Sequence, residues 1–129
     1  MELLQNAAPN TCFILGLQNF PERVELQDMK TVVIINSKGG SGKSTLAANL
    51  AANYALKGRN PAILDLDPQG SSMRWLQNRP DDLPVIHGIA GYEKKSTVTR
   101  SWQLQPPEGT APLIVDTPAG LERTGLAAT

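Results

Sequence analysis

One stretch, residues 31–45, constrains what this 129-residue chain can fold into more than any other. It reads Thr-Val-Val-Ile-Ile-Asn-Ser-Lys-Gly-Gly-Ser-Gly-Lys-Ser-Thr. The β-branched run Val32–Ile35 has no polar interruption, which is typical of a parallel strand that is buried on both faces. A glycine-rich turn follows over residues 37–42. Residues 43–56 then place apolar side chains on one helical face, at Leu46, Ala47, Leu50, Ala51, Tyr54 and Ala55.

A strand, a glycine loop and a helix start in this order predict a phosphate-binding cradle. The free N–H groups of the loop and of the first helical turn point at one spot, and the helix dipole favours an anion there. Gly39, Gly40 and Gly42 allow the tight turn and a close approach of the backbone to phosphate oxygens. Lys43 would supply a mobile positive charge for the terminal phosphates, and the hydroxyl of Ser44 is suited to Mg²⁺.

The loop departs from the general phosphate-loop pattern in one position. That pattern has a glycine five residues before Gly42, where this chain has Ser37, and Lys38 opens the segment Lys-Gly-Gly-Ser-Gly-Lys-Ser-Thr. This segment is a deviant Walker A motif, and it resembles the ParA/MinD family of ATPases. A chance glycine-rich turn is the alternative, which the strand and helix on either side disfavour. The resemblance implies that nucleotide is bound by Lys38, Gly39, Gly40, Ser41, Gly42, Lys43, Ser44 and Thr45.

Two further apolar runs predict strands beside the first. Pro61–Asp67 follows Gly58, a good C-terminal stop for the first helix, and Leu113–Asp116 comes later in the chain. Both runs end in acidic residues. We therefore expect an α/β fold with a mostly parallel sheet and flanking helices, as in part of a P-loop NTPase domain.

The acids of these runs should gather at the carboxyl edge of the sheet, where open α/β folds bind ligands. Ser44 can bind Mg²⁺ directly, while Asp65 and Asp116 can hold it through its waters, because Mg²⁺ keeps much of its hydration. Asp67 is the best candidate to position the water that attacks the terminal phosphate. For one acid alone a solvated loop carboxylate is the simpler interpretation, but three acids beside a phosphate loop favour a shared site.

Two more segments resemble the same family. Asp65–Gly70, Asp-Leu-Asp-Pro-Gln-Gly, matches its second acidic motif, whose last aspartate serves hydrolysis, and Leu113–Asp116 resembles its Walker B motif. In the family, the lysine at the position of Lys38 reaches across a dimer to the partner's nucleotide. The resemblance therefore implies an ATPase that converts ATP and water to ADP and phosphate, with the catalytic residues Lys38, Lys43 and Asp67.

The resemblance also implies a setting for this activity. It points to the cofactors ATP and Mg²⁺, an ATP-dependent homodimer, and a cytoplasmic role in partition of plasmid or chromosomal DNA. A ParB-like activator and non-specific DNA would be the further partners. From Lys30 onward, eleven Lys and Arg against eight Asp and Glu leave a net charge of +3, which supports contact with a polyanion only mildly.

Other members of the family share the loop but differ elsewhere. Cys12 is the sole cysteine, which argues against the nitrogenase iron protein branch and its paired cysteines. A MinD-like positioning ATPase needs a C-terminal amphipathic helix, and Asp-Pro-Gln-Gly after the second strand favours the ParA branch instead. Because the family's domain usually continues well beyond Walker B, the chain resembles a domain truncated there. A nucleotide-binding module without turnover therefore stays open.

The expected domain covers residues 29–129, since members of the family commonly begin with a methionine, a basic residue and the first strand. Residues 1–28 form an N-terminal extension with two interpretations, a non-native or disordered leader and a short ordered arm that packs on the sheet. No apolar run is long enough to span a bilayer.

Between the second and third runs the pattern is weaker. It predicts a helix over residues 72–78 that Ser71 caps, with Met73, Trp75 and Leu76 as its apolar residues, and a short strand over residues 83–89. His87 has no Cys or His nearby, so a structural role is expected. A basic segment over residues 94–102 could contact a partner, although a solvated helix face is the simpler interpretation. A last helix is expected over residues 121–129.

Overall fold

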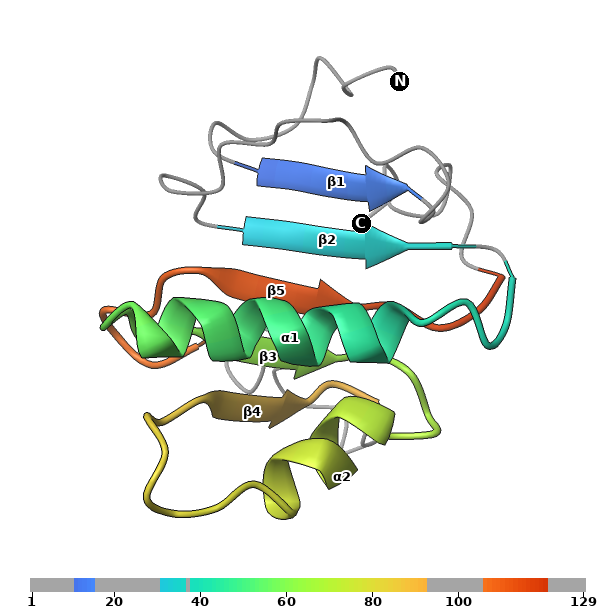
Figure 1. The fold of residues 1–129 in the computed structure, drawn as a ribbon. Coiled ribbons are helices and arrows are strands. Elements are labelled where there is room, and N and C mark those ends of the chain that lie inside the picture. The colour runs from blue at the N-terminus through green and yellow to red at the C-terminus, as the bar shows by residue number, and fades with distance from the viewer. Residues whose placement is uncertain (1–10, 16–30, 37, 93–105, 121–129) are drawn as a thin grey trace, which may run out of the picture.

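The computed structural model describes residues 11–15, 31–36, 38–92 and 106–120 (Figure 1). Its strands pair in parallel as one five-stranded sheet, in the order β1-β2-β5-β3-β4. The predicted α/β fold, with a mostly parallel sheet and flanking helices, is confirmed. The elements in chain order are β1 (Thr11–Leu15), β2 (Thr31–Ile35), α1 (Lys43–Leu56), β3 (Ala62–Asp65), α2 (Ser71–Gln77), β4 (His87–Ala90) and β5 (Leu113–Asp116).

The order of the strands brings the ends of β2, β3 and β5 together. β5 lies between β2 and β3, although it is the last strand of the described chain. Asp116 is the register partner of Ile34 on one side and of Asp65 on the other. Figure 1 shows all strand arrowheads and the start of α1 at the same edge of the sheet. The loop after β2 and the acids of β3 and β5 therefore share one edge.

The sheet buries its apolar residues on both faces, as the β-branched run predicts. On one face, α1 packs against the sheet with small side chains that permit a close approach, and this cluster consists of Val32, Ile34, Ala47, Leu50, Ala51, Tyr54, Ile63 and Ile114. Val33, Ile35 and Val115 form a second buried cluster. Burying each of these larger aliphatic side chains contributes about 1.5–3 kcal/mol. The predicted apolar face of α1 is confirmed, except that Leu46 is only half-buried at the edge of the cluster.

The end of α1 shows why Gly58 stops the helix. Gly58 has a left-handed φ of 77°. Its N–H donates to the carbonyl of Ala55 at 3.0 Å, and the N–H of Arg59 donates to the carbonyl of Tyr54 at 3.1 Å. These two bonds form a Schellman motif, which satisfies carbonyls that the helix end leaves free. Gly58 allows the chain to turn away without a Cβ penalty.

We expect Gly58→Ala to lower the free energy of unfolding by about 1 kcal/mol, because alanine is strained in the left-handed region. Urea unfolding monitored by circular dichroism measures this change. Lys57→Ala is the control, since Lys57 has a φ of −84° that any residue adopts, and it should change stability much less. Equal stabilities for the two variants would contradict the role of Gly58.

Helix α2 differs from its prediction at its start. It begins at Ser71 after Gly70, which has a left-handed φ of 61°, and no side chain caps it. The prediction that Ser71 caps the helix is wrong, because the hydroxyl of Ser71 instead accepts a bond from Arg74 at 3.3 Å. Trp75, one of the predicted apolar residues of this helix, is 37% exposed, and the guanidinium of Arg79 lies 5.9 Å from its ring centroid. This spacing is within the range of a cation–π contact.

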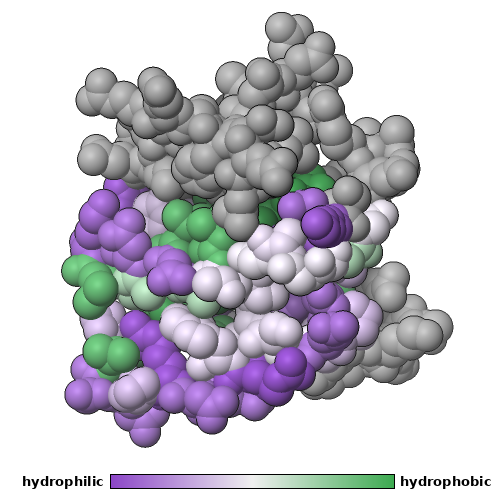
Figure 2. Space-filling view, turned by 45° about the vertical axis from the view of Figure 1, so that its right-hand side comes forward, coloured by the Kyte–Doolittle hydropathy of each residue, from purple (hydrophilic) through white to green (hydrophobic). Residues whose placement is uncertain are grey.

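Two predicted strands are shorter than expected. The second strand ends at Asp65, so that Asp67 belongs to the turn that follows β3. The strand expected over residues 83–89 is β4 and begins only at His87, whose N–H donates to the carbonyl of Pro61 at 3.1 Å. Leu83 and Val85 lie before it and are exposed. Figure 2 shows hydrophobic residues near the left edge as small spots among hydrophilic ones, which is usual for a protein surface.

Some predictions concern residues outside those described. Within residues 1–28, only Thr11–Leu15 is described, and it pairs in parallel with β2 from Thr11↔Thr31 to Leu15↔Ile35. These five residues form an edge strand of the sheet, and both interpretations of residues 1–28 stay predictions. The basic segment 94–102 and the helix expected over 121–129 lie outside the described residues, and the boundary at residue 29 stays a prediction. No helix in the described part of the chain is long and apolar enough to cross a membrane.

Candidate functional site

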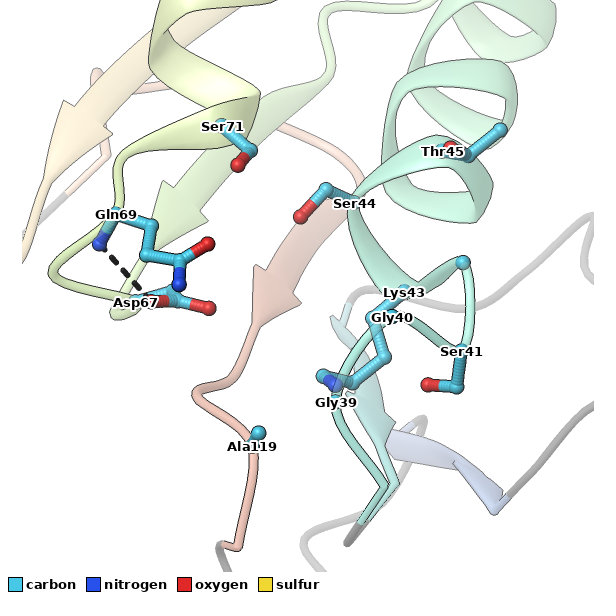
Figure 3. A pocket seen from close by; sticks show the side chains of 11 residues that line it. Gly39, Gly40, Ser41, Lys43, Ser44, Thr45, Asp67, Gln69, Ser71 and Ala119 are labelled. Atoms are coloured by element: carbon cyan, nitrogen blue, oxygen red, sulfur yellow. Dashed lines mark hydrogen bonds between the residues drawn. The ribbon is translucent and has the colours of Figure 1, made fainter.

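A pocket of about 340 Å³ opens between the loop after β2 and the turn after β3 (Figure 3). This size falls in the range of small-molecule sites. Seven of the expected nucleotide-binding residues, 39–45, line one side of it. Lys38 does not line it. The lining residues are Gly39, Gly40, Ser41, Gly42, Lys43, Ser44, Thr45, Asp67, Gln69, Ser71 and Ala119.

The backbone of the loop prepares the start of α1 for an anion. Gly40 and Gly42 have left-handed φ values of 69° and 87°, which only glycine adopts readily. Gly42 is the N-cap residue, and α1 has neither a side-chain cap nor an acid in its first turn. The N–H groups and the positive dipole end of α1 are therefore not matched by its own side chains, and they suit a phosphate in the pocket.

Lys43 places a positive charge inside this loop. It is only 9% exposed, and its Nζ donates to the carbonyl oxygen of Lys38 at 3.4 Å. Figure 3 shows the side chain running back along the loop toward Gly39. That bond uses one of the three donors of an ammonium group. A charge this buried is costly unless it is paired and hydrogen-bonded, and an anion in the pocket would supply the pairing.

Lys38 has a different place from Lys43. Its side chain is exposed, while its backbone N–H donates to Oδ1 of Asn36 at 3.0 Å and its carbonyl accepts from Lys43. The backbone of Lys38 therefore helps to shape the loop, whereas its charge lies outside the pocket lining.

Asp67 faces the loop from the other side of the pocket. Its N–H donates to Oδ1 of Asp65 at 3.1 Å, and its own Oδ1 accepts from the N–H of Gln69 at 3.0 Å. A turn closes with the bond from the Gly70 N–H to the Asp67 carbonyl at 2.9 Å. Figure 3 shows the carboxylate of Asp67 pointing into the gap, and the hydroxyl of Ser44 pointing back toward the same turn. A ligand on the loop would meet this carboxylate.

Asp65 and Asp116 do not line the pocket. Both are fully buried, at 0% exposure. Side chains alternate along a strand, so each lies on the same face as the isoleucine two residues before it, which packs under α1. The structure thus separates the three expected acids, with Asp67 in the pocket and the other two between the sheet and its helices.

The two buried carboxylates have different partners. Oδ1 of Asp65 accepts from the Asp67 N–H, and Oδ2 accepts from the Met73 N–H at 3.2 Å. Oδ2 of Asp116 accepts from the hydroxyl of Ser72 at 2.7 Å, whereas Oδ1 of Asp116 is buried and has no hydrogen-bond partner among the described residues. An unpartnered buried oxygen of a carboxylate is costly.

Burial is the main reason that the pKa of Asp65 is raised above its ordinary value of 3.8. The N–H groups of Met73 and Asp67 oppose this shift, while the charges of Asp116 and Asp67 add to it. Because the folded-state pKa is raised, the stabilising contribution of this group is complete below pH 3.8 and is lost as the pH rises through the folded value. Burial therefore makes the charged form of Asp65 costly, and a nearby cation would offset that cost.

The donors present fit Mg²⁺ rather than a metal held wholly by protein. Among the described residues, no three His, Cys, Asp or Glu side chains come together as a metal site. Mg²⁺ is usually held by one or two carboxylates, waters and substrate phosphates. The hydroxyl of Ser44 and the unpartnered Oδ1 of Asp116 are oxygens of the required kind.

Sequence reasoning did not assign four residues of this region to the site. Gln69, Ser71 and Ala119 line the pocket, and Ser72 holds Asp116. Gln69 and Ser71 could have been found from their place directly after Asp67, because turns at strand ends carry ligand contacts. The contact of Ser72 joins residues that lie 44 positions apart, and no local pattern indicates it.

Comparison with known proteins bears on the same region. A family model described as the CobQ/CobB/MinD/ParA nucleotide binding domain matches residues 32–128. The chain is 37% identical over 99 residues to "Maintenance of carboxysome distribution protein A" of Gloeobacter kilaueensis, which covers 77% of this chain and 43% of the relative. It is 52% identical over 64 residues to "Chromosome-partitioning ATPase Soj" of Treponema pallidum, which covers 50% of this chain and 22% of the relative.

A third relative is "Protein IncC" of Escherichia coli, which is 40% identical over 57 residues, or 44% of this chain and 16% of the relative. In each of these comparisons the chain matches less than half the length of its relative. No solved structure matches the chain significantly.

Proposed function

Because the chain belongs to the CobQ/CobB/MinD/ParA nucleotide-binding family, we propose that it binds ATP with Mg²⁺ and hydrolyses it to ADP and phosphate. The observation that carries this proposal is the pocket itself. On one side lie the uncapped start of α1 and the buried ammonium of Lys43, and on the other lies the carboxylate of Asp67. Phosphoryl transfer needs this combination of a phosphate cradle, positive charge and a positioned water.

Each side of the pocket has its own part in the reaction. The N–H groups of residues 39–45 and the ammonium of Lys43 hold the phosphates and stabilise the charge that moves onto ADP as it leaves. Asp67 accepts a hydrogen bond from the attacking water and turns the oxygen of that water toward the terminal phosphorus. Ser44 and, through water, Asp116 and Asp65 would hold Mg²⁺, which when bound neutralises charge on the phosphate oxygens.

We further propose that the protein acts as an ATP-dependent homodimer in partition, in the cytoplasm, together with a ParB-like activator and non-specific DNA. Relatives named as a chromosome-partitioning ATPase and a carboxysome distribution protein support a partition role. On these names, a chromosome or a carboxysome is the kind of cargo that we propose.

The dimer proposal rests on Lys38. Lys43 already brings a charge into the pocket of its own subunit, while the side chain of Lys38 is exposed outside the lining. We expect Lys38→Gln to leave ATP binding by the monomer nearly unchanged and to lower both ATP-dependent dimerisation and turnover, by about 10-fold or more, because a charge supplied in trans is lost.

Light scattering with and without ATP, run beside a phosphate-release assay, measures both effects. Lys57→Gln is the matched control, because this exposed lysine lies at the opposite end of α1. Normal dimerisation together with normal turnover in Lys38→Gln would refute the role in trans.

A nucleotide-binding module without turnover is the second candidate. It is favoured by one observation, namely that Asp65 and Asp116, two of the three expected acids, are fully buried and do not line the pocket. Calorimetry with ATP and Mg²⁺ together with a single-turnover assay separates the two candidates. Binding followed by phosphate release supports the ATPase, and binding without release at any protein concentration supports the module.

A further inference from the structure

The first turn of α2 holds both buried acids of the sheet. The hydroxyl of Ser72 donates to Oδ2 of Asp116 at 2.7 Å, and the next N–H, that of Met73, donates to Oδ2 of Asp65 at 3.2 Å. Ser72 is itself fully buried, at 0% exposure. The turn that ends at Ser71 lines the pocket. One short segment therefore connects the pocket wall to the acids behind it.

The bond to Ser72 decides how the carboxylate of Asp116 is turned. With Oδ2 held, rotation of the carboxylate is restricted and Oδ1 stays in one place, where it is buried and no residue in the described part of the chain bonds to it. A buried unpaired polar atom in a native structure requires an explanation, and an absent ion or water is a usual one. Asp116 lies on the face of the sheet that α1 covers, and α1 also carries Ser44 in its first turn.

We propose that Ser72 is a positioning residue for the magnesium site. By holding Oδ2 of Asp116, it keeps Oδ1 available to the water shell of the cation that Ser44 binds. This inference rests on the proposed function, because it assigns a role in the Mg²⁺ site of the same pocket. Residues behind metal ligands commonly fix ligand orientation in this way, and losing one costs about 10- to 100-fold in metal affinity or activity.

Because of its position, the effect of Ser72 on the Mg²⁺ site can be measured separately from direct contacts to the nucleotide. Ser72 does not line the pocket, so it acts on bound nucleotide only through Asp116. Replacing it with alanine would leave both oxygens of a buried carboxylate without a partner and free to rotate. The response of nucleotide binding to Mg²⁺ should then change, while binding without Mg²⁺ should not.

The test measures binding of a fluorescent ATP analogue to the full chain, first in EDTA and then across a series of Mg²⁺ concentrations. We expect Ser72→Ala to bind the analogue in EDTA with an affinity within about twofold of the parent's. The Mg²⁺ concentration at which the affinity has made half of its Mg²⁺-dependent change should rise about 10-fold. Ser72→Cys fills the position with a slightly larger sulfur atom and a weak S–H donor, so it should restore little of the Mg²⁺ response that the alanine variant loses. Because it fills the same space, it also tests the proposal if the alanine variant does not fold.

Leu50→Ala serves as the stability control. Leu50 packs in the cluster under α1, so its loss lowers the thermal midpoint without touching the acids, and the Mg²⁺ response should stay as in the parent. Full restoration by Ser72→Cys, or equal losses of affinity with and without Mg²⁺, would show that Ser72 only fills space and would overturn the proposal. If the parent chain shows no Mg²⁺-dependent binding at all, the proposed function itself fails, and this inference fails with it.

Discussion

Replacing Lys43 with alanine should abolish measurable nucleotide binding. Lys43 is 9% exposed, and its ammonium lies against the loop whose residues 39–45 line the pocket. A charge-assisted hydrogen bond contributes about 1.5–3 kcal/mol, so that losing even one weakens binding about 10- to 150-fold. The loss should exceed this, because the ammonium neutralises more than one phosphate oxygen.

Calorimetry with ATP and Mg²⁺ on Lys43→Ala and the parent checks this expectation. Lys43→Met is the sharper variant, since it keeps the apolar stem in the loop and removes only the charge. The control is Lys57→Ala, which removes an exposed lysine from the far end of the same helix. If Lys43→Met binds ATP as tightly as the parent, the pocket does not hold phosphate as we propose.

The second large effect concerns Asp67, whose loss should stop hydrolysis and spare binding. Its carboxylate faces the phosphate loop across the pocket and lies away from the residues that would hold the phosphates (Figure 3). Groups that position or activate an attacking water contribute roughly 10²- to 10⁴-fold to the rate. Asp67→Ala should therefore lower the rate of phosphate release at least about 100-fold, with ATP affinity little changed.

A matched variant removes the charge and keeps the turn. Oδ1 of Asp67 accepts from the N–H of Gln69 at 3.0 Å, and Asp67→Asn retains an oxygen for that bond. If hydrolysis depends on the negative charge of Asp67, the rate of phosphate release should fall in both variants. If it depends only on the hydrogen bond to Gln69 in the turn, the rate should fall mainly in Asp67→Ala. Asp82→Asn, in an exposed loop, is the control for loss of an acid. Unchanged phosphate release in Asp67→Asn would exclude the proposed role.

The stretch from Val32 to Leu56 could be predicted well because its interactions are local. An unbroken β-branched run has to be buried, and left-handed glycines such as Gly42 turn the chain where other residues would be strained. Helical spacing then predicts which face of α1 packs. The pocket wall formed by residues 39–45 follows from these local rules alone.

Helix α2 shows where local rules mislead. A serine before an apolar helical segment indicates an N-cap, yet Gly70 takes that position. A Cβ at Gly70 would lie 2.7 Å from the hydroxyl oxygen of Tyr92, which follows β4. Glycine at the helix start is therefore favoured both by its left-handed φ of 61° and by a close contact with a residue far along the chain, and such distant contacts leave no pattern in neighbouring residues.

By itself, the sequence determined the strand, the glycine loop, the helix and the acids at two strand ends, because each depends on neighbours within a few residues. Only the tertiary structure decided that β5 lies between β2 and β3, so that Asp65 and Asp116 are register partners. It also decided which acid faces the pocket. The pairing of distant strands and the packing of α2 bury Asp65 and Asp116, two of the three acids. Whether a carboxylate contacts solvent, a ligand or Ser72 therefore depends on which element packs over it.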